Sequence, residues 1–173
     1  MDPKVSHLTA KQIPEILKIL NEVIMTSTSV YYYDPLPIDQ IEKWFQQKME
    51  LELPVIGILD EASMLLGFAT FGPFRHWPAY QYTIEHSIYI HHEHRGLGHA
   101  TRLLAALIDL AREKKYHNMI AGIDATNLAS KRLHMGFGFE SCAYIKHAGH
   151  KFGKWLDLEF YQLLLTDQMT SKL

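Results

Sequence analysis

The chain has a single cysteine, Cys142, so it cannot form an internal disulfide. It also lacks a surplus of basic residues, because 17 Lys and Arg stand against 19 Asp and Glu, and the pI is about 6.6. A protein that binds the phosphate backbone normally carries such a surplus, so we expect no nucleic-acid partner. No stretch approaches the roughly 18 apolar residues of a membrane span, and the N-terminus has no apolar signal-peptide core. We expect a soluble, cytoplasmic protein with no membrane attachment.

The sequence of 173 residues also lacks internal repeats, low-complexity tracts and Gly/Ser-rich linkers. Hydrophobic residues make up 47% of the chain. A chain of this size can bury roughly two thirds of its unfolded surface in one core. We therefore expect one domain over residues 1–173.

Helical spacing dominates the beginning of the chain. Thr9 and Gln12 form a capping-box pattern. The apolar residues that follow recur every three or four positions and predict a helix over about 10–25: Ile13, Ile16, Leu17, Leu20 and Ile24. Residues 26–37, TSTSVYYYDPLP, are rich in Ser, Thr, Tyr and Pro and predict a loop. A second, shorter helix is predicted over about 38–48.

The hydrophobic period changes in the middle of the chain. Short apolar runs at 54–59 and 64–71 predict a hairpin, and residues 82–90 alternate as a strand that carries Glu85 on its more polar face. A helix over about 98–114, a strand at 118–124, a helix at 129–136 and two strands split by residues 147–154 follow. The predicted order is strand, two helices, three strands, helix, strand, helix, two strands. This order indicates an α/β fold with a mixed sheet.

The segment HHEHRGLGHATRLL at 91–104 joins the predicted strand to the predicted helix. Gly96 and Gly98 stand where a phosphate site needs glycine, because a backbone without side chains can approach an anion closely. The N-terminus of the helix adds about half a positive charge. A ligand-free connection between strand and helix would have the same pattern. Neither the Walker A loop nor the dinucleotide fingerprint is present.

The histidines of the same segment raise a metal site as an alternative. His92 and His94 project to one side if the strand continues, and Glu93 and His99 could add further ligands. Zinc needs three or four donors that converge on one point. Nothing in the sequence fixes that geometry, so we expect no bound metal.

Residues 95–100, RGLGHA, match the Q/R-x-x-G-x-G/A pyrophosphate signature of the GNAT superfamily of N-acetyltransferases. Three longer segments, at 85–104, 121–140 and 149–163, resemble its phosphinothricin and methionine sulfoximine acetyltransferase branch, and the resemblance extends from near residue 5 to residue 165. It implies a GNAT fold with a mixed, mostly antiparallel sheet that splays between its fourth and fifth strands. It also implies a homodimer that uses acetyl-CoA as co-substrate.

The resemblance implies three sets of contacts to acetyl-CoA. Backbone amides of the glycine loop would cradle the pyrophosphate, with Arg95 opening the loop: Gly96, Leu97, Gly98, His99, Ala100 and Thr101. The pantetheine arm would pair like an added strand with Ile88, Tyr89 and Ile90. Asn127 and Ser130 would make polar contacts at the start of the next helix, where Asn127 also fits an ordinary N-cap.

Two residues are expected to act on protons. An ammonium group has no lone pair, so a carboxylate must take its proton before the nitrogen can attack. Glu85 lies where the branch carries its catalytic glutamate, although a strand glutamate could equally pair with a neighbouring cation. His134 lies where many superfamily members carry a tyrosine that protonates the CoA thiolate, and a core histidine is the alternative.

The acceptor site is expected between the 26–37 and 73–82 loops. Arg75 matches a branch arginine that would grip an amino-acid carboxylate with two hydrogen bonds. Pro78, Ala79 and Tyr80 match a segment that lines the substrate, together with Glu85. Cys142 could in principle carry the acetyl group, but its place in an alternating strand favours a plain core thiol.

These features together predict an N-acetyltransferase that acetylates the α-amino group of a small amino-acid-like molecule such as methionine sulfoximine, methionine sulfone or phosphinothricin. Other small amines or a peptide N-terminus are alternative acceptors. A non-catalytic acyl-CoA-binding module and a histidine-rich metal-binding protein are the alternatives from other classes.

Overall fold

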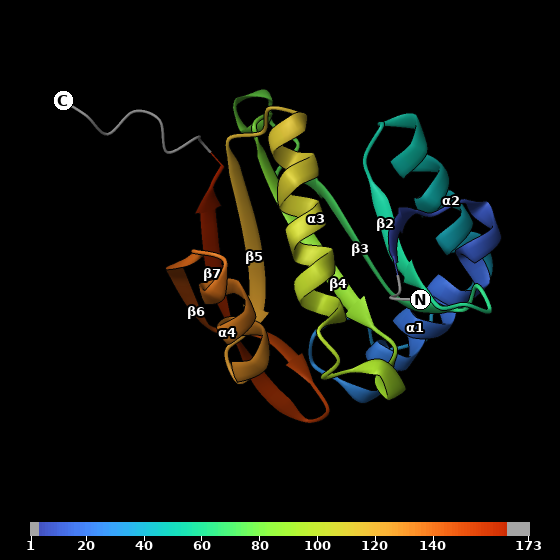
Figure 1. Cartoon of the computed structure of the whole chain (residues 1–173). Coiled ribbons are helices and arrows are strands. Elements are labelled where there is room, and N and C mark those ends of the chain that lie inside the picture. The colour runs from blue at the N-terminus through green and yellow to red at the C-terminus, as the bar shows by residue number, and fades with distance from the viewer. Residues whose placement is uncertain (1–3, 166–173) are drawn as a thin grey trace.

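One open, mixed sheet of seven strands organises the structure, a computed structural model that describes residues 4–165 (Figure 1). The strands lie in the spatial order β1-β2-β3-β4-β5-β7-β6. Only the pair of β4 and β5 is parallel. The strand bounds are β1 Lys4–His7, β2 Val55–Leu59, β3 Leu65–Pro73, β4 Thr83–Ile90, β5 Asn118–Asp124, β6 Glu140–Lys151 and β7 Lys154–Leu164.

Helices cover both faces of this sheet. They are α1 (Ile13–Thr26), α2 (Ile38–Glu50), α3 (His99–Glu113) and α4 (Leu128–Gly136). Val55 packs in one apolar cluster with α1 and α2, whereas its neighbour Ile56 packs in a second cluster with α3. Successive side chains of a strand point to opposite faces, so α1 and α2 lie on one face and α3 lies on the other. Leu133 of α4 packs against the α3 cluster, which places α4 on the same face as α3.

The sheet splays between β4 and β5, as the resemblance implied. The two strands pair only where Thr83–Glu85 lie beside Asn118–Ile120. Beyond these residues β4 continues to Ile90, while β5 continues to Asp124 paired with β7 alone. The predicted fold class and element order are therefore confirmed. The extent of the domain over the whole of 1–173 stays a prediction, because the description covers residues 4–165.

The C-terminal hairpin differs from the prediction. We expected residues 147–154 to separate its two strands, but β6 runs to Lys151 and β7 starts at Lys154, which leaves a two-residue turn. Gly153 has φ +71 in that turn. Gly149 lies within β6, and a glycine is needed there because the Tyr31 ring comes within 2.6 Å of the position that a Cβ would take. Glycine therefore allows a close approach at one position and a turn at the other.

The prediction of a core thiol at Cys142 was wrong. Cys142 is exposed on β6, the edge strand of the sheet. The pairing of β6 with β7 shifts register between Ser141 and Ala143, so Cys142 lies at a bulge and its thiol donates to the carbonyl of Phe160 at 3.3 Å. A bulge inserts one unpaired residue, which breaks the alternation on which the prediction rested.

Among residues 4–165, no helix combines the length and the apolar character that crossing a bilayer requires.

Candidate active site

The glycine loop has the backbone geometry of an anion site. Gly96 has φ +77 and Gly98 has φ +80, and no atom lies within 4 Å of the positions that their Cβ atoms would take. The glycines are therefore needed for their left-handed backbone rather than for space. Gly98 caps α3 without a side-chain hydrogen bond, and the first turn of α3 has no acidic residue. The positive end of the helix dipole thus faces the loop without an acidic side chain in the first turn of α3 to balance it.

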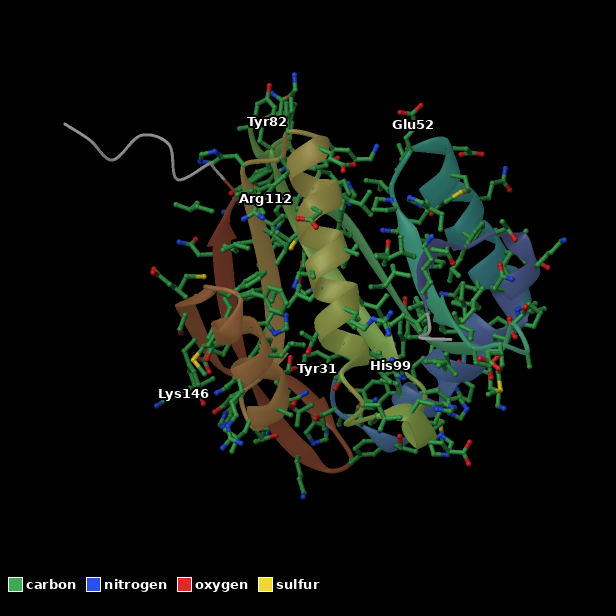
Figure 2. All side chains as sticks on the ribbon, viewed as in Figure 1. Tyr31, Glu52, Tyr82, His99, Arg112 and Lys146 are labelled. Carbon is green, nitrogen blue, oxygen red and sulfur yellow. The ribbon has the colours of Figure 1, made fainter. Side chains whose placement is uncertain are left out.

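A cavity of about 740 Å³ opens beside this loop and extends into the gap between β4 and β5. It is lined by most of the residues predicted to hold the cofactor: Ile88, Tyr89, Ile90, Arg95, Gly96, Gly98, His99, Ala100, Thr101, Asn127 and Ser130. His134 lines it too. Leu97 does not line the cavity. It is 64% exposed, so only its backbone amide remains a candidate contact to the cofactor. Figure 2 shows His99 at the lower end of α3 and Tyr31 at the same end of the sheet.

Several lining residues carried no sequence signal. They are His86 and Ser87 of β4, Ala121, Gly122, Ile123 and Asp124 of β5, Ala129 and Leu133 of α4, and Val23, Ser27 and Ser29 at the end of α1. Their place in the cavity depends on how far the two strands part, which neither residue type nor spacing encodes. The predicted acceptor residues, in contrast, do not line this cavity.

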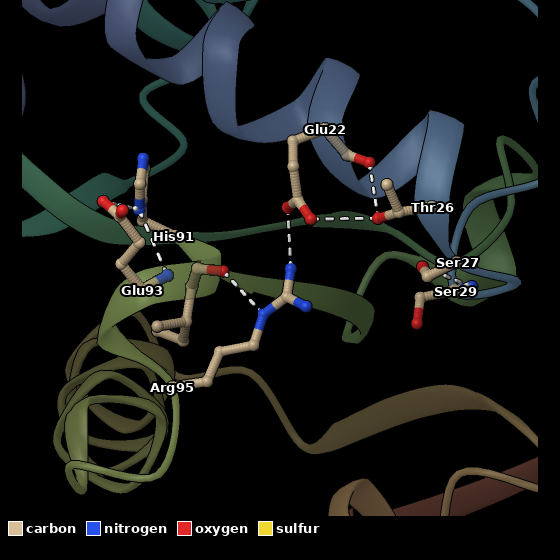
Figure 3. A network of polar contacts seen from close by, with 8 residues as sticks. Glu22, Thr26, Ser27, Ser29, His91, Glu93 and Arg95 are labelled. Atoms are coloured by element: carbon tan, nitrogen blue, oxygen red, sulfur yellow. Dashed lines mark hydrogen bonds and ion pairs between the residues drawn. The ribbon is translucent and has the colours of Figure 1, made fainter.

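Arg95 ties the loop to α1 (Figure 3). Its Nη2 donates to Glu22 Oε2 at 2.7 Å, and its Nε donates to the carbonyl of Ile90 at 3.1 Å. Thr26 in turn donates to the other carboxylate oxygen of Glu22 at 2.9 Å. The ion pair is partly exposed, so its direct contribution to stability is small. Its main effect is to fix the position of the loop relative to α1.

The histidine cluster differs from the predicted metal alternative. The residues whose ligand atoms come within 4.8 Å of one another are His91, Glu93 and His94, rather than His92 and His99. The buried ring of His91 already accepts a hydrogen bond from the backbone N–H of Glu93 at 3.4 Å, and this bond caps the short helix at 92–94. That bond uses the Nδ1 lone pair. We therefore interpret the cluster as part of the loop structure.

Glu85 lies on the opposite face of β4 from His86 and directs its carboxylate toward β5. A Cβ built on Gly122 would lie 3.1 Å from Oε1 of Glu85. Because Gly122 also lines the large cavity, the carboxylate lies at the edge of that cavity. Burial raises the pKa of Glu85, and the positive charge of Arg75 lowers it to a smaller extent. A half-buried carboxylate with a raised pKa binds a proton more tightly than a solvated one, which suits a group that accepts a proton.

The structure brings the predicted acceptor residues together around Phe74. The guanidinium of Arg75 lies 4.1 Å from the centre of the Phe74 ring, and its Nη1 donates to the carbonyl of Phe74 at 2.8 Å. The ring of Tyr80 meets Phe74 edge-on at 5.8 Å. Pro78 and Ala79 belong to the same short helix, 78–80. This group follows the end of β3, where Gly72 pairs with Glu85 and Pro73 pairs with Ile84.

The other predicted wall of the acceptor site, the 26–37 loop, is held by a buried lysine. Lys151 is 2% exposed, and its Nζ donates to three backbone carbonyls, those of Ile24, Ser27 and Val30, at 2.6–2.9 Å. Val30 and Tyr32 of this loop line a second cavity of about 190 Å³, together with Ser87 and Tyr89. No residue of the 73–82 loop lines that cavity.

His134 lies on α4 with both ring nitrogens occupied. Its Nδ1 is 2.7 Å from the carbonyl oxygen of Ser130, and its Nε2 is 3.1 Å from Nε2 of His86. Burial lowers the pKa of His134, while the Ser130 carbonyl raises it to a smaller extent. Burial and the nearby His134 lower the pKa of His86 to about 3. Both rings are therefore neutral near pH 7.

The fold and the loop match a known family. A sequence profile described as "Acetyltransferase (GNAT) family" matches residues 18–139. The chain belongs to the GNAT acetyltransferase family. An L-methionine sulfoximine/L-methionine sulfone acetyltransferase of Salmonella typhimurium is 38% identical over 152 residues, which are 88% of either chain.

Solved GNAT structures agree. An N-acetyltransferase from Staphylococcus aureus has a TM-score of 0.94 and 44% identity, covering 96% of this chain and 100% of the other. A phosphinothricin acetyltransferase from Sinorhizobium meliloti, in complex with acetyl-CoA, has a TM-score of 0.93 and 29% identity, covering 99% of this chain and 93% of the other. The chain is therefore an N-acetyltransferase with acetyl-CoA as its co-substrate, and the left-handed glycines, the uncapped α3 terminus and the adjoining cavity fit that molecule.

Proposed function

We propose that this enzyme transfers the acetyl group of acetyl-CoA to the α-amino group of a small amino-acid-like acceptor such as methionine sulfoximine, methionine sulfone or phosphinothricin. The observation that carries this proposal is the position of Glu85. Its carboxylate borders the cofactor cavity through Gly122 and lies near Arg75. A carboxylate and a guanidinium at this spot suit the ammonium and carboxylate groups of an amino acid.

The cofactor would be held mostly by backbone groups. Residues 96–101 form the glycine loop and the first turn of α3, and a pyrophosphate at such a helix N-terminus is stabilised by N–H groups and by the helix dipole. The edge of β4 at residues 88–90 has no partner in β5, so its backbone groups are available for the pantetheine amides. Asn127 caps α4 by accepting from the N–H of Ser130 at 3.0 Å, and its side-chain amide N–H groups are donors for the same arm.

Glu85 would act as the general base. At neutral pH the acceptor arrives as an ammonium ion, so its nitrogen must lose a proton before it attacks the thioester carbonyl. The pKa of Glu85 is raised by burial, which brings its affinity for a proton closer to that of the amine. Arg75, Pro78, Ala79 and Tyr80 would position the acceptor, with the guanidinium of Arg75 binding its carboxylate.

His134 would assist the departure of the CoA thiolate. It lies on the α3 face of the sheet, whereas Glu85 lies on the α1 face, and the cavity runs through the splay between them. The amine would approach from one side of the sheet and the thiolate would leave toward the other. This arrangement separates the group that takes a proton from the group that assists the sulfur.

The direct test is release of free thiol from acetyl-CoA with each of the three acceptors. We expect turnover with at least one of them, and no thiol release with any of them would remove the substrate assignment. Glu85→Gln should lower kcat by about 10² to 10⁴ while the Kd for acetyl-CoA stays unchanged. Glu140→Gln, which removes an exposed strand glutamate on β6, is the matched control and should keep full activity.

We further propose that the enzyme is a cytoplasmic homodimer. The exposed edge strand β6 and its hairpin carry large apolar side chains on the surface: Tyr144, Ile145, Phe152 and Trp155. Such a patch beside an unpaired strand edge is typical of an interface. Light scattering after size-exclusion chromatography should give twice the chain mass, and Trp155→Lys should shift the population toward monomer.

A further inference from the structure

The two buried histidines beside the cofactor cavity form a short hydrogen-bonded chain. His86 of β4 is 7% exposed and His134 of α4 is 4% exposed. Their rings lie nearly parallel, 17° apart, with centroids 5.0 Å apart, and Phe139 meets both rings edge-on. The two Nε2 atoms are 3.1 Å apart, which is hydrogen-bond distance. One of them must therefore carry the hydrogen and the other the lone pair.

The neighbours of His134 decide which nitrogen carries the hydrogen. Nδ1 of His134 lies 2.7 Å from the carbonyl oxygen of Ser130, and a carbonyl can only accept, so Nδ1 must be the N–H. A neutral ring has one N–H, hence Nε2 of His134 is the acceptor. Nε2 of His86 must then be the donor. Nδ1 of His86 is then a buried lone pair that has no hydrogen-bond partner within the described residues 4–165.

This arrangement leaves His134 without a proton that faces the cavity. Its N–H is directed at Ser130 and its lone pair accepts from His86. Ser130 lines the cavity, and its Oγ is 3.3 Å from the same N–H, so the hydroxyl oxygen can act as a second acceptor. Within residues 4–165 the structure gives the hydroxyl hydrogen of Ser130 no other partner. That hydrogen is free to point into the cavity.

We propose that the Ser130 hydroxyl, and not the His134 ring, is the hydrogen-bond donor to the CoA sulfur, and that His86 is a positioning residue which holds His134 in the tautomer that orients this hydroxyl. The inference rests on the proposed function. It deepens that function because it assigns the assistance of His134 to a route through Ser130.

The proton balance of the reaction agrees with a donor that gives a hydrogen bond rather than a net proton. The new N–C bond forms while the C–S bond breaks, and the electron pair of that bond stays on sulfur. The ammonium nitrogen loses two protons in total, of which the sulfur takes up one and the solvent receives the other. A neutral histidine that gave up a proton would become an imidazolate, which is unfavourable. The histidine pair does not need to do so, because the proton that the sulfur takes up comes from the ammonium group.

The test measures the acidity of the CoA thiol in the enzyme complex by the ultraviolet absorbance of the thiolate. A hydrogen bond to a charged acceptor stabilises it by about 1.5 to 3 kcal/mol. We therefore expect the bound thiol to be about tenfold or more stronger as an acid in the wild-type enzyme than in Ser130→Ala. Ser6→Ala removes an exposed hydroxyl on β1, outside the lining of the cavity, and should titrate as wild type.

Two variants of His86 separate positioning from packing. His86→Leu removes the N–H donor and should weaken the bound thiol as an acid, as Ser130→Ala does. His86→Gln keeps an N–H at similar reach and should restore the wild-type titration. Long-range ¹⁵N NMR of the wild-type protein needs no variant, and should show hydrogen on Nδ1 of His134 and on Nε2 of His86.

A thiol that titrates identically in the wild type and in Ser130→Ala would overturn the proposal, as would hydrogen on Nε2 of His134. Calorimetry with CoA distinguishes this failure from failure of the proposed function. If CoA binds and the titrations coincide, only the role of Ser130 falls. If CoA does not bind to the wild-type protein, the proposed function falls with it.

Discussion

Glu85 and Gly122 face each other across the point where β4 and β5 begin to separate. The position a Cβ would take on Gly122 lies 3.1 Å from Oε1 of Glu85, and the two strands are still paired at Glu85 and Ile120. Ile120 and Gly122 are two positions apart and share a face of β5. The glycine therefore leaves room for the carboxylate at the edge of the cofactor cavity, and the width of the splay at this point sets the position of the proposed base.

Gly122→Ala should displace the carboxylate. The added methyl group would also lie 3.4 Å from the Phe160 ring and 3.7 Å from Leu158, so those side chains limit its movement and Glu85 must yield. A displacement of about 1 Å can cost about 10²-fold in rate, and because relief of this contact needs a smaller shift we expect kcat to fall by roughly tenfold or less.

The measurement is kcat together with the Kd for acetyl-CoA, which should change little. Gly136→Ala is the control, because a Cβ there meets no atom within 4 Å. Equal losses in both variants would assign the effect to general destabilisation.

Arg75→Gln should change both the binding of the acceptor and the pH dependence of the reaction. The positive charge of Arg75 lowers the pKa of Glu85, in opposition to burial, so its removal should raise that pKa further. Because the base works only when it is deprotonated, the acid limb of kcat/KM should move to higher pH. KM for the acceptor should rise as well, since the proposed bidentate contact with the acceptor carboxylate would be lost.

The comparison for this prediction is Arg112→Gln, which removes an exposed arginine paired with Asp109 on α3. Its pH profile should overlay that of the wild type. An acid limb that stays in place in Arg75→Gln would mean that the base is not Glu85 or that Arg75 does not act on it.

Glu22→Gln should weaken the binding of acetyl-CoA without touching the cofactor cavity, which Glu22 does not line. The variant removes the charge that holds Arg95, whose Nη2 is 2.7 Å from Glu22 Oε2, and so loosens the glycine loop. Partly exposed ion pairs contribute up to about 1 kcal/mol, so we expect a two- to fivefold rise in Kd by calorimetry. Glu42→Gln, an exposed glutamate on α2, removes the same charge and should bind as wild type. A Kd that rises equally in both variants would indicate an effect of net charge.

Much of the fold could be predicted from hydrophobic periods. The helix predicted over 98–114 is α3 at His99–Glu113, because its apolar residues recur at helical spacing and pack against one face of the sheet. The β6–β7 turn is shorter than the predicted break at 147–154, because residues 147–151 continue β6. Gly149 is a glycine because of the close approach of Tyr31.

The site was predictable only in part. The glycine loop is local in sequence, so its motif is visible without a structure, and the resemblance supplied the strand residues 88–90. The pair of His86 and His134 joins residues 48 positions apart, and the contact of Glu85 with Gly122 crosses two strands. Such contacts depend on strand order and splay, which a single sequence does not fix.

As the pH falls, the free energy of unfolding of the wild-type protein should decrease more steeply than that of a variant without His86. In the folded protein burial and His134 hold the pKa of His86 at about 3, whereas the unfolded chain has the ordinary value of 6.5. Between these two values the unfolded state binds a proton that the folded state does not, so the free energy of unfolding decreases as pH falls below about 6.5. The slope approaches about 1.4 kcal/mol per pH unit.

Urea denaturation of the wild type and of His86→Gln at pH 7 and pH 5.5 tests this slope. We expect the wild type to lose about 1 kcal/mol more than the variant between these pH values. His134 is present in both proteins, so its own lowered pKa largely cancels in the comparison. Equal losses in the two proteins would show that His86 takes up a proton in the folded state. In that case the buried pair would carry a charge at mildly acidic pH. The neutral tautomer inferred for His134 would then apply only above the pH at which the pair takes up that proton.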